Sequence, residues 1–128
     1  MAGSLPRPTD AELEILRVLW ERGPSTVRHV HEAIAGARDT GYTTTLKLMQ
    51  IMAEKGLVTR DESSRTHVYA ARLSQDQTQR QLVLDLMNRA FGGRPAALVM
   101  QALSAQAATA DELREIRKLI EQYKEKGR

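Results

Sequence analysis

Residues 41–69 constrain the fold more than any other part of the chain. Residues 42–55 predict a helix, and Gly56 stands where that helix would end. The runs 57–60 and 66–69 are rich in β-branched and aromatic residues and are separated by a polar stretch, which predicts a β-hairpin. A helix followed by a hairpin, with short helices before it, is the order of elements in a winged helix-turn-helix domain.

The predicted helix over 42–55 has one apolar face and one small polar face. At about 100° per residue, the apolar sector holds the residues expected in the core, which are Thr45, Leu48, Met49 and Met52. The opposite sector holds Thr43, Lys47, Gln50 and Glu54, with Thr44, Leu46 and Ile51 on its margins. A helix that enters a DNA major groove about 12 Å wide needs such a face, because bulky or acidic side chains would clash with or be repelled by the phosphates.

Side chains on this polar face suit particular parts of a duplex. Thr43 and Thr44 lie at the amino end of the helix, where backbone N–H groups without helical partners attract a phosphate. Lys47 and Gln50 are long enough to reach the base edges, and Leu46 could touch a thymine methyl group. The competing interpretation is an ordinary amphipathic helix whose polar side is simply solvated.

Two shorter helices are predicted before this one. Thr9 and Glu12 form a capping box at the start of the first, and apolar residues then recur at helical spacing. Ser25 is the expected N-cap of the second helix. If the third helix lies in the major groove, the start of the second reaches the DNA backbone through Ser25, Thr26 and Arg28.

The polar tip of the hairpin, residues 61–65, is the predicted wing. Arg65 in this tip, with His67 in the following strand, could meet phosphates or the minor groove beside the third helix. Arg60 lies nearby and could add to the same basic surface. For a single arginine in a hairpin, plain solvation is the competing interpretation.

Residues 74–128 predict three further helices. Gly92-Gly93 ends the first, and a second capping box, Thr109 with Glu112, begins the last. Each helix carries an apolar stripe, and we expect these stripes to form a dimer interface that includes Leu82, Leu86, Phe91, Leu98, Leu113, Ile116, Ile120 and Tyr123. Three short helices bury little core alone, so a symmetric homodimer is expected. The alternative is that they fold back on the winged domain as one monomeric core.

The predicted architecture is therefore mainly α with a small β-hairpin wing. A winged helix-turn-helix DNA-binding domain over residues 1–73 precedes a helical dimerisation domain over residues 74–128. The net charge is +3, of which the first segment carries only +1, with ten Lys and Arg against nine Asp and Glu. Any attraction to DNA must therefore come from where the charges are placed.

Composition excludes several classes of function. The chain has no cysteine, and its two neighbouring histidines, His29 and His31, would point about 200° apart on a helix and could not share a metal ion. We expect both on the surface of the second helix. No catalytic constellation is present, so neither enzyme activity nor a cofactor or metal is expected. Apolar runs are short and no signal pattern begins the chain, which predicts a cytoplasmic protein without membrane insertion.

Several motifs together resemble one bacterial family, the penicillinase and methicillin-resistance repressors (BlaI/MecI). These motifs are Pro8-Thr9-Asp10-Ala11-Glu12-Leu13-Glu14-Ile15-Leu16 running to Leu19-Trp20, Thr26-Val27-Arg28, Tyr42-Thr43-Thr44-Thr45, Glu54-Lys55-Gly56-Leu57-Val58 and Val68-Tyr69. The resemblance implies a dimeric repressor of transcription that binds palindromic operators in promoters. The alternative function is a winged-helix module that docks proteins, with Leu46 and Ile51 as exposed anchors.

The sequence departs from the better-known members of that family at three points. Ile51-Met52 stands where they usually carry Arg-Leu, which puts the half-site sequence in doubt. A membrane sensor protease cuts an Asn-Phe bond in antibiotic-responsive members, and the region that resembles it here reads Met100-Gln101-Ala102-Leu103. Such a protease is therefore a candidate partner only. Copper-responsive relatives sense the metal through cysteines, which this chain lacks.

Overall fold

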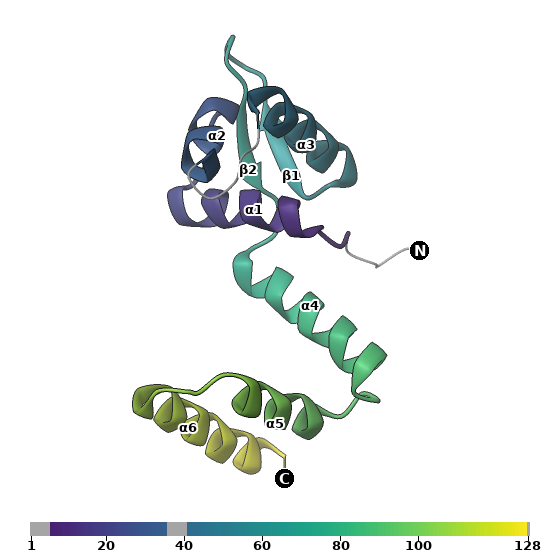
Figure 1. Ribbon diagram of the computed structural model, residues 1–128, viewed down its shortest axis with the longest axis vertical. Helices are drawn as coiled ribbons and strands as arrows, with labels where there is room; N and C mark the ends of the chain where they lie inside the picture. The colour runs from purple at the N-terminus through teal and green to yellow at the C-terminus, as the bar shows by residue number, and fades with distance from the viewer. Residues whose placement is uncertain (1–5, 36–40, 128) are drawn as a thin grey trace. The chain divides into compact units, whose positions relative to one another are not determined.

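The computed structural model describes residues 6–35 and 41–127. The described elements are α1 (Asp10–Arg22), α2 (Val27–Ala35), α3 (Tyr42–Lys55), β1 (Val58–Asp61), β2 (Val68–Ala71), α4 (Gln75–Ala90), α5 (Pro95–Ala105) and α6 (Ala110–Lys126) (Figure 1). The mainly helical class with one small hairpin is confirmed. None of the described helices is both long enough and apolar enough to cross a membrane.

The chain forms two compact units that divide inside α4, between Val83 and Leu84. The domain boundary expected between residues 73 and 74 stays a prediction. The two units are described separately below.

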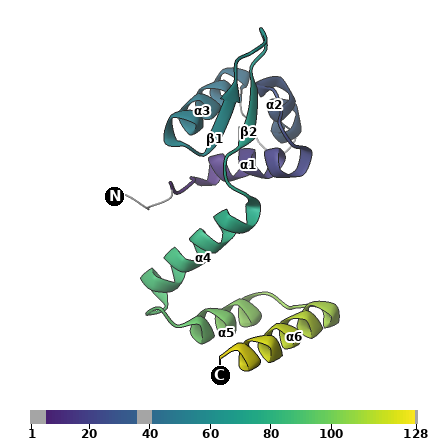
Figure 2. The ribbon, with the colours of Figure 1, turned by 180° about the vertical axis from the view of Figure 1, so that it is seen from behind.

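The N-terminal unit has a core of its own, formed by α1, α2, α3 and the hairpin (Figure 2). Its buried apolar side chains are Ile15, Leu16, Leu19, Val27, Val30, Ile34, Met49, Met52, Leu57, Val58 and Tyr69. Each of α1, α2, α3 and the two strands contributes at least one of these side chains, so the apolar faces of the three helices are covered within the unit.

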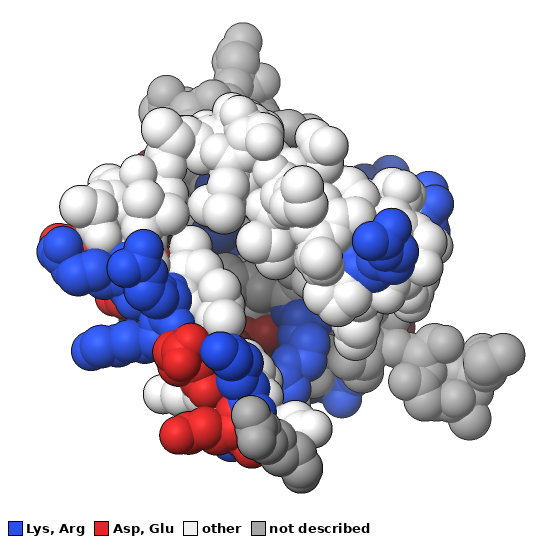
Figure 3. All heavy atoms as spheres, turned by 90° about the horizontal axis from the view of Figure 1, so that it is seen from below, with Lys and Arg blue, Asp and Glu red and all other residues white. Residues whose placement is uncertain are grey.

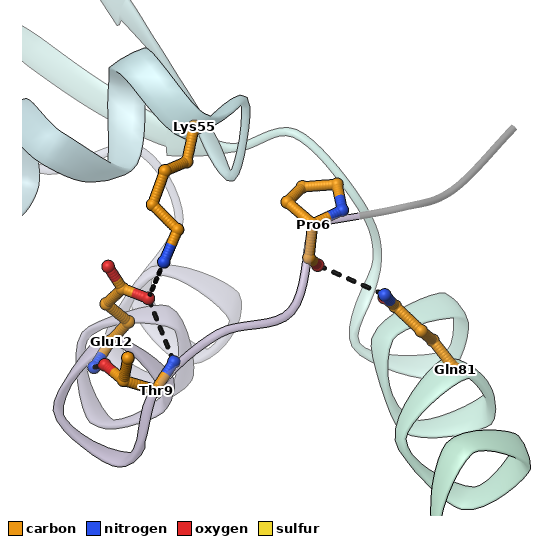
Figure 4. Close-up of polar contacts among 5 residues, drawn as sticks. All are labelled: Pro6, Thr9, Glu12, Lys55 and Gln81. Carbon is orange, nitrogen blue, oxygen red and sulfur yellow. Dashed lines mark hydrogen bonds and ion pairs between the residues drawn. The ribbon is translucent and has the colours of Figure 1, made fainter. Parts of the chain in front are cut away.

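A capping box fixes the start of α1, as predicted. The Thr9 hydroxyl accepts a hydrogen bond from the Glu12 amide at 3.2 Å, and the Glu12 carboxylate accepts one from the Thr9 amide at 2.9 Å. The carboxylate also pairs with Lys55 Nζ at 2.7 Å, although the Glu12 side chain is almost fully buried (Figure 4). One carboxylate therefore links the first turn of α1 to the last turn of α3.

Gly56 ends α3 in a conformation that favours glycine. Its φ of 84° and ψ of 16° are left-handed, and its amide donates to the Ala53 and Met52 carbonyls. The Arg72 Nε donates to the Gly56 carbonyl at 2.6 Å, so a side chain beyond the hairpin completes this helix end. The hairpin is thus held against the end of the helix that precedes it.

The strands are displaced from their predicted positions. They span Val58–Asp61 and Val68–Ala71 and pair antiparallel, with Arg60 opposite Tyr69. Leu57 instead completes the end of α3, because its amide donates to the Met52 carbonyl at 2.9 Å. The predicted strands, 57–60 and 66–69, were therefore wrong by one residue and by two residues.

The residue Ser25 joins the hairpin instead of capping α2. Its amide donates to the Tyr69 carbonyl at 2.9 Å, and the Tyr69 amide donates back at 2.8 Å. The Thr26 hydroxyl accepts a hydrogen bond from the His29 amide at 3.2 Å and takes the capping role. The N-cap prediction for Ser25 was therefore wrong by one residue, because a backbone bridge determines its place.

The first half of α4 belongs to the N-terminal unit. The Trp20 indole Nε1 donates to the Leu73 carbonyl at 2.9 Å, and the Gln81 amide nitrogen donates to the Pro6 carbonyl at 3.2 Å (Figure 4). Ser74 and Gln77 exchange backbone-to-side-chain hydrogen bonds of 2.9 and 3.0 Å, which cap the helix. These contacts hold the connection at the point where it leaves the winged domain.

The helices of the C-terminal unit are well formed but little covered. The capping box of Thr109 with Glu112 is present as predicted, and Gly92 and Gly93 both have positive φ where α4 ends. Neither α5 nor α6 has a buried residue. In Figure 3 much of the visible surface is uncharged, and Lys and Arg side chains lie both beside Asp and Glu at the lower left and apart from them at the right.

Candidate nucleic-acid interface

The start of α2, the outer face of α3 and the hairpin surround one open concavity of about 590 Å³. It is lined by Thr26, Val27, Arg28, His29, Tyr42, Leu46, Gln50, Arg60, Arg65, Thr66, His67 and Tyr69. Six of the ten predicted DNA contacts are therefore brought together, namely Thr26, Arg28, Leu46, Gln50, Arg65 and His67. These residues come from three separate elements, so the fold creates the surface and no single motif does.

The outer face of α3 continues this surface. Thr43, Thr44 and Lys47 are exposed, while Thr45, Met49 and Met52 are buried, as the helical spacing predicts. The other core expectation, Leu48, is only half-buried and packs at the edge of the core. A run of short polar side chains and one lysine is thus presented outward along the helix.

Ser25 does not belong to this surface. Its side chain is 6% exposed and its hydroxyl donates to the Gly23 carbonyl at 2.9 Å. A hydroxyl that is buried and already bonded cannot reach a phosphate. The burial of Ser25 gives its predicted DNA contact no support, and Thr26, the residue before α2, is the first one here that lines the concavity.

Tyr42 is a lining residue that the predicted contact set lacked. The Arg28 guanidinium carbon lies 5.7 Å from the centre of the Tyr42 ring, a distance suited to a cation–π contact. On another side, the His31 ring meets Tyr42 edge-on, with ring centres 5.8 Å apart. Tyr42 therefore positions a cation of α2 at the amino end of α3.

His31 is a half-buried link between α2 and α3, so its expected surface position was wrong. Its Nδ1 lies 3.2 Å from the hydroxyl of Thr45, which is fully buried. His29 is exposed, as predicted. Within the described residues, no group of three or more His, Asp or Glu side chains is placed to hold a metal ion.

Arg60, which was expected only to add to the basic surface near the wing, also lines the concavity. Its guanidinium makes contacts of 2.6 Å through Nε and Nη2 with the Glu62 carboxylate. Hydrogen bonds with the side chains of Tyr69 and then Glu62 raise the pKa of Arg60 above its ordinary value. Its place on this surface follows from the hairpin register, which puts residue 60 opposite buried Tyr69.

The wing tip is shaped by Asp61. The Ser63 amide donates to the Asp61 carboxylate at 2.9 Å, and the Ser64 hydroxyl donates to the Thr66 carbonyl at 2.8 Å. The hydrogen bonds from Ser63 lower the pKa of the Asp61 carboxyl. The tip therefore keeps a defined turn although all of its residues are exposed.

Comparison with known proteins identifies the group to which this architecture belongs. A family model described as the penicillinase repressor matches residues 8–122. The chain belongs to the penicillinase repressor family. Among its relatives, the transcriptional regulator BlaI of Mycobacterium tuberculosis is 39% identical over 113 residues, which cover 86% of this chain and 82% of that protein. The penicillinase repressor of Bacillus licheniformis is 20% identical over 120 residues, or 94% of each chain.

Solved structures in the same family share the winged fold. The DNA-binding domain of the repressor BlaI matches with a TM-score of 0.51 at 21% identity, over 56% of this chain and 88% of that domain. The Bacillus licheniformis BlaI monomer in complex with the blaP half-operator matches with a TM-score of 0.50 at 20% identity, over 57% and 89% of the two chains. The winged helix-turn-helix prediction is confirmed by these matches.

One departure of this penicillinase repressor family member lies at the edge of the candidate interface. Ile51 stands where better-known members usually have arginine, and its side chain is 37% exposed on α3. It does not line the concavity, whereas Gln50 does. The missing cation therefore leaves Lys47 as the only Lys or Arg on the described part of α3 before its last turn.

Proposed function

We propose that the chain is a sequence-specific transcriptional repressor that binds palindromic operators as a homodimer in the bacterial cytoplasm. The observation that carries the proposal is the concavity, in which the predicted contacts of α2, α3 and the wing converge. Polar and cationic groups from three elements around one hollow suit a duplex, because each element can meet a different part of the DNA.

In the proposed complex, α3 lies in the major groove. Lys47 and Gln50 reach the base edges, since both are exposed on its outer face. Thr43 and Thr44 bring hydroxyls to the amino end of α3, where backbone N–H groups also favour a phosphate. Leu46 supplies an apolar contact for a thymine methyl group from the wall of the concavity.

The remaining contacts hold the protein on the DNA backbone. Thr26 and Arg28 approach phosphates from the start of α2, with Arg28 positioned by the Tyr42 ring. From the wing, Arg65 and His67 approach phosphates or the minor groove. Such contacts fix orientation, and they contribute to the salt dependence of binding.

The uncovered helices of the C-terminal unit support the proposal of a homodimer. Large apolar side chains there are exposed, including Leu86, Leu113, Ile120 and Tyr123. The proposed interface also includes Leu82, Phe91, Leu98 and Ile116, which are half-buried in one chain. A two-fold dimer would cover these side chains and present two reading helices, so a palindromic operator matches its symmetry. Occupying a promoter in this way blocks RNA polymerase.

A membrane sensor protease is a further proposed partner. The segment 92–110 is its candidate target, because it is rich in glycine and alanine, and Gly92 and Gly93 interrupt the helical backbone there. Incubation of the purified chain with the cognate sensor would produce two fragments. An intact chain after full activation of the sensor would exclude this route of induction.

Selection from a library of random duplexes, at near-physiological salt, tests the main proposal. We expect recovery of an inverted repeat bound by two chains. Lys47→Ala and Thr44→Ala are expected to lose binding while the dimer survives. Glu21→Gln, at an exposed position on α1, is a control of unchanged binding. Unchanged affinity in both α3 variants would exclude α3 as the reading helix.

The alternative is a protein-docking module, and one observation favours it. Ile51 is exposed and Leu46 is half-buried, so α3 carries apolar surface at the margins of its polar face. A docking module would give no enriched duplex from the library. Binding to a protein partner through these two residues would also be insensitive to salt, in contrast to contacts with phosphates.

A further inference from the structure

The Arg60–Glu62 pair lies where the proposed interface needs positive charge. Arg60 lines the concavity, and it lies on the same face of the hairpin as its cross-strand partner Tyr69. Glu62 follows two residues later and binds both Nε and Nη2 of Arg60 at 2.6 Å. The guanidinium therefore offers its charge to the concavity only in combination with a neighbouring carboxylate.

The other arginines of the concavity are placed differently. Arg28 lies over an aromatic ring, and Arg65 is exposed in the wing. Neither forms an ion pair with any residue that the structure describes. Arg60 is thus set apart from its neighbours by an acidic partner at the DNA-facing surface.

We propose that Glu62 is a built-in restraint on DNA affinity, because a phosphate must displace it from Arg60. This inference rests on the proposed function and concerns the strength of binding at the same site. The pair is half-exposed, with side-chain exposures of 35% for Arg60 and 52% for Glu62. Glu62 accepts both contacts through the single oxygen Oε2, whereas a phosphate can accept two parallel hydrogen bonds from arginine on two oxygens. Exposed ion pairs are weak, so a phosphate can exchange with Glu62.

The restraint acts on every duplex in the same way. A phosphate contact carries no base sequence, so removing the competing carboxylate strengthens binding to operator and to random DNA by the same factor. The variant also gains one effective cation, which steepens the dependence of log affinity on log salt by about 0.9. A distorted wing would instead change the ratio between the two affinities, so this ratio separates restraint from a structural effect.

The test measures Glu62→Gln on two probes, a duplex recovered from the library selection and a random duplex of equal length. We expect affinity for both to rise about fivefold near 0.1 M salt, with the steeper salt slope described above. Glu21→Gln removes the same charge from an exposed position on α1, outside the concavity, and should change affinity less than about twofold.

The same substitution in an Arg60→Gln background shows whether Glu62 acts through Arg60. The gain from Glu62→Gln is expected to fall below about twofold there, because the cation that it releases is absent. An undiminished gain in that background, or no gain in the chain with Arg60, would overturn the proposal. Failure of the unaltered chain to bind either duplex would instead reject the proposed function itself.

Discussion

The two compact units use the same local signals but differ in what covers their helices. The helix α1 and the helix α6 both begin with a Thr–Glu capping box, at Thr9 and Thr109. The first helix buries Glu12, Ile15, Leu16 and Leu19, whereas the second buries nothing. Capping therefore determines where a helix starts, and only tertiary packing determines whether its apolar face is satisfied.

The apolar side chains of the winged domain are covered within one chain, whereas those of α5 and α6 are not. The N-terminal core draws on α1, α2, α3 and both strands. Apolar side chains of α6 such as Leu119 and Ile120 remain about half-exposed. Substitutions in the two units should therefore change different observables, and the following predictions are ordered by expected size.

The largest effect is expected in the N-terminal core. Ile15 is fully buried, and Ile15→Ala should lower the free energy of unfolding by about 2–5 kcal/mol. Urea unfolding followed by the fluorescence of the single tryptophan, Trp20, measures this, because Trp20 lies in the N-terminal unit. Ile120→Ala is the matched substitution in α6 and should leave that transition in place. An equal loss of unfolding free energy in both variants would show that the two units do not differ in how well their helices are covered.

A charge in the exposed stripe of α6 should dissociate the proposed dimer. Ile120→Glu places a carboxylate in the expected interface and should weaken association by about 100-fold or more, or about 2–3 kcal/mol. Sedimentation equilibrium measures the effect. Gln122→Glu adds the same charge at an exposed position outside the proposed interface and serves as the control. A dimer constant that is unmoved by Ile120→Glu would place the interface elsewhere.

The paired capping boxes give a direct test of the contrast between the units. Thr9→Ala should lower the stability of the N-terminal unit by about 1 kcal/mol, since the Glu12 amide loses its acceptor. Thr109→Ala removes the equivalent bond at 3.0 Å from α6. Its effect should be confined to helix content by circular dichroism, with the Trp20 transition unchanged. A shift of that transition by Thr109→Ala would show that the units unfold together.

The smallest effect concerns the wing tip. Hydrogen bonds from Ser63 lower the pKa of Asp61, so an NMR titration of this carboxyl should give a midpoint below the ordinary value of 3.8. A lowered pKa in the folded state means that this contribution to stability is present above about 3.8. It is lost as the pH falls through the folded value. A midpoint at or above 3.8 would mean that the turn is not formed in solution.

Sequence reasoning located the helices well because their signals are local. The capping residues, the glycine stops and the burial of Thr45 all follow from helical spacing within a few residues. It also gave the winged fold, through the order of elements and the family resemblance. The boundary between the compact units inside α4 lies beyond the reach of such signals, because the first turns of α4 contact residues far away in the sequence, as Gln81 does with Pro6.

The misplaced details depend on partners far away in the sequence. Ser25 pairs with the backbone of Tyr69 and does not cap α2. His31 is half-buried, where its ring contacts the Thr45 hydroxyl. Arg60 became prominent because the hairpin register puts it opposite Tyr69. A periodic pattern cannot report which strand a residue will meet, so these positions needed the folded structure.

Tyr69 limits how the elements of the proposed DNA interface can move relative to one another. Its backbone pairs with Arg60 on one side and with Ser25 on the other, while its side chain is buried in the core. The wing and the start of α2 are therefore both bonded to the same residue, and the distance between them is fixed. A duplex that does not match this spacing has to bend or twist, at a cost set by its own base-pair steps. The stiffness of the operator DNA, as well as its base edges, would then contribute to the affinity of this protein for it.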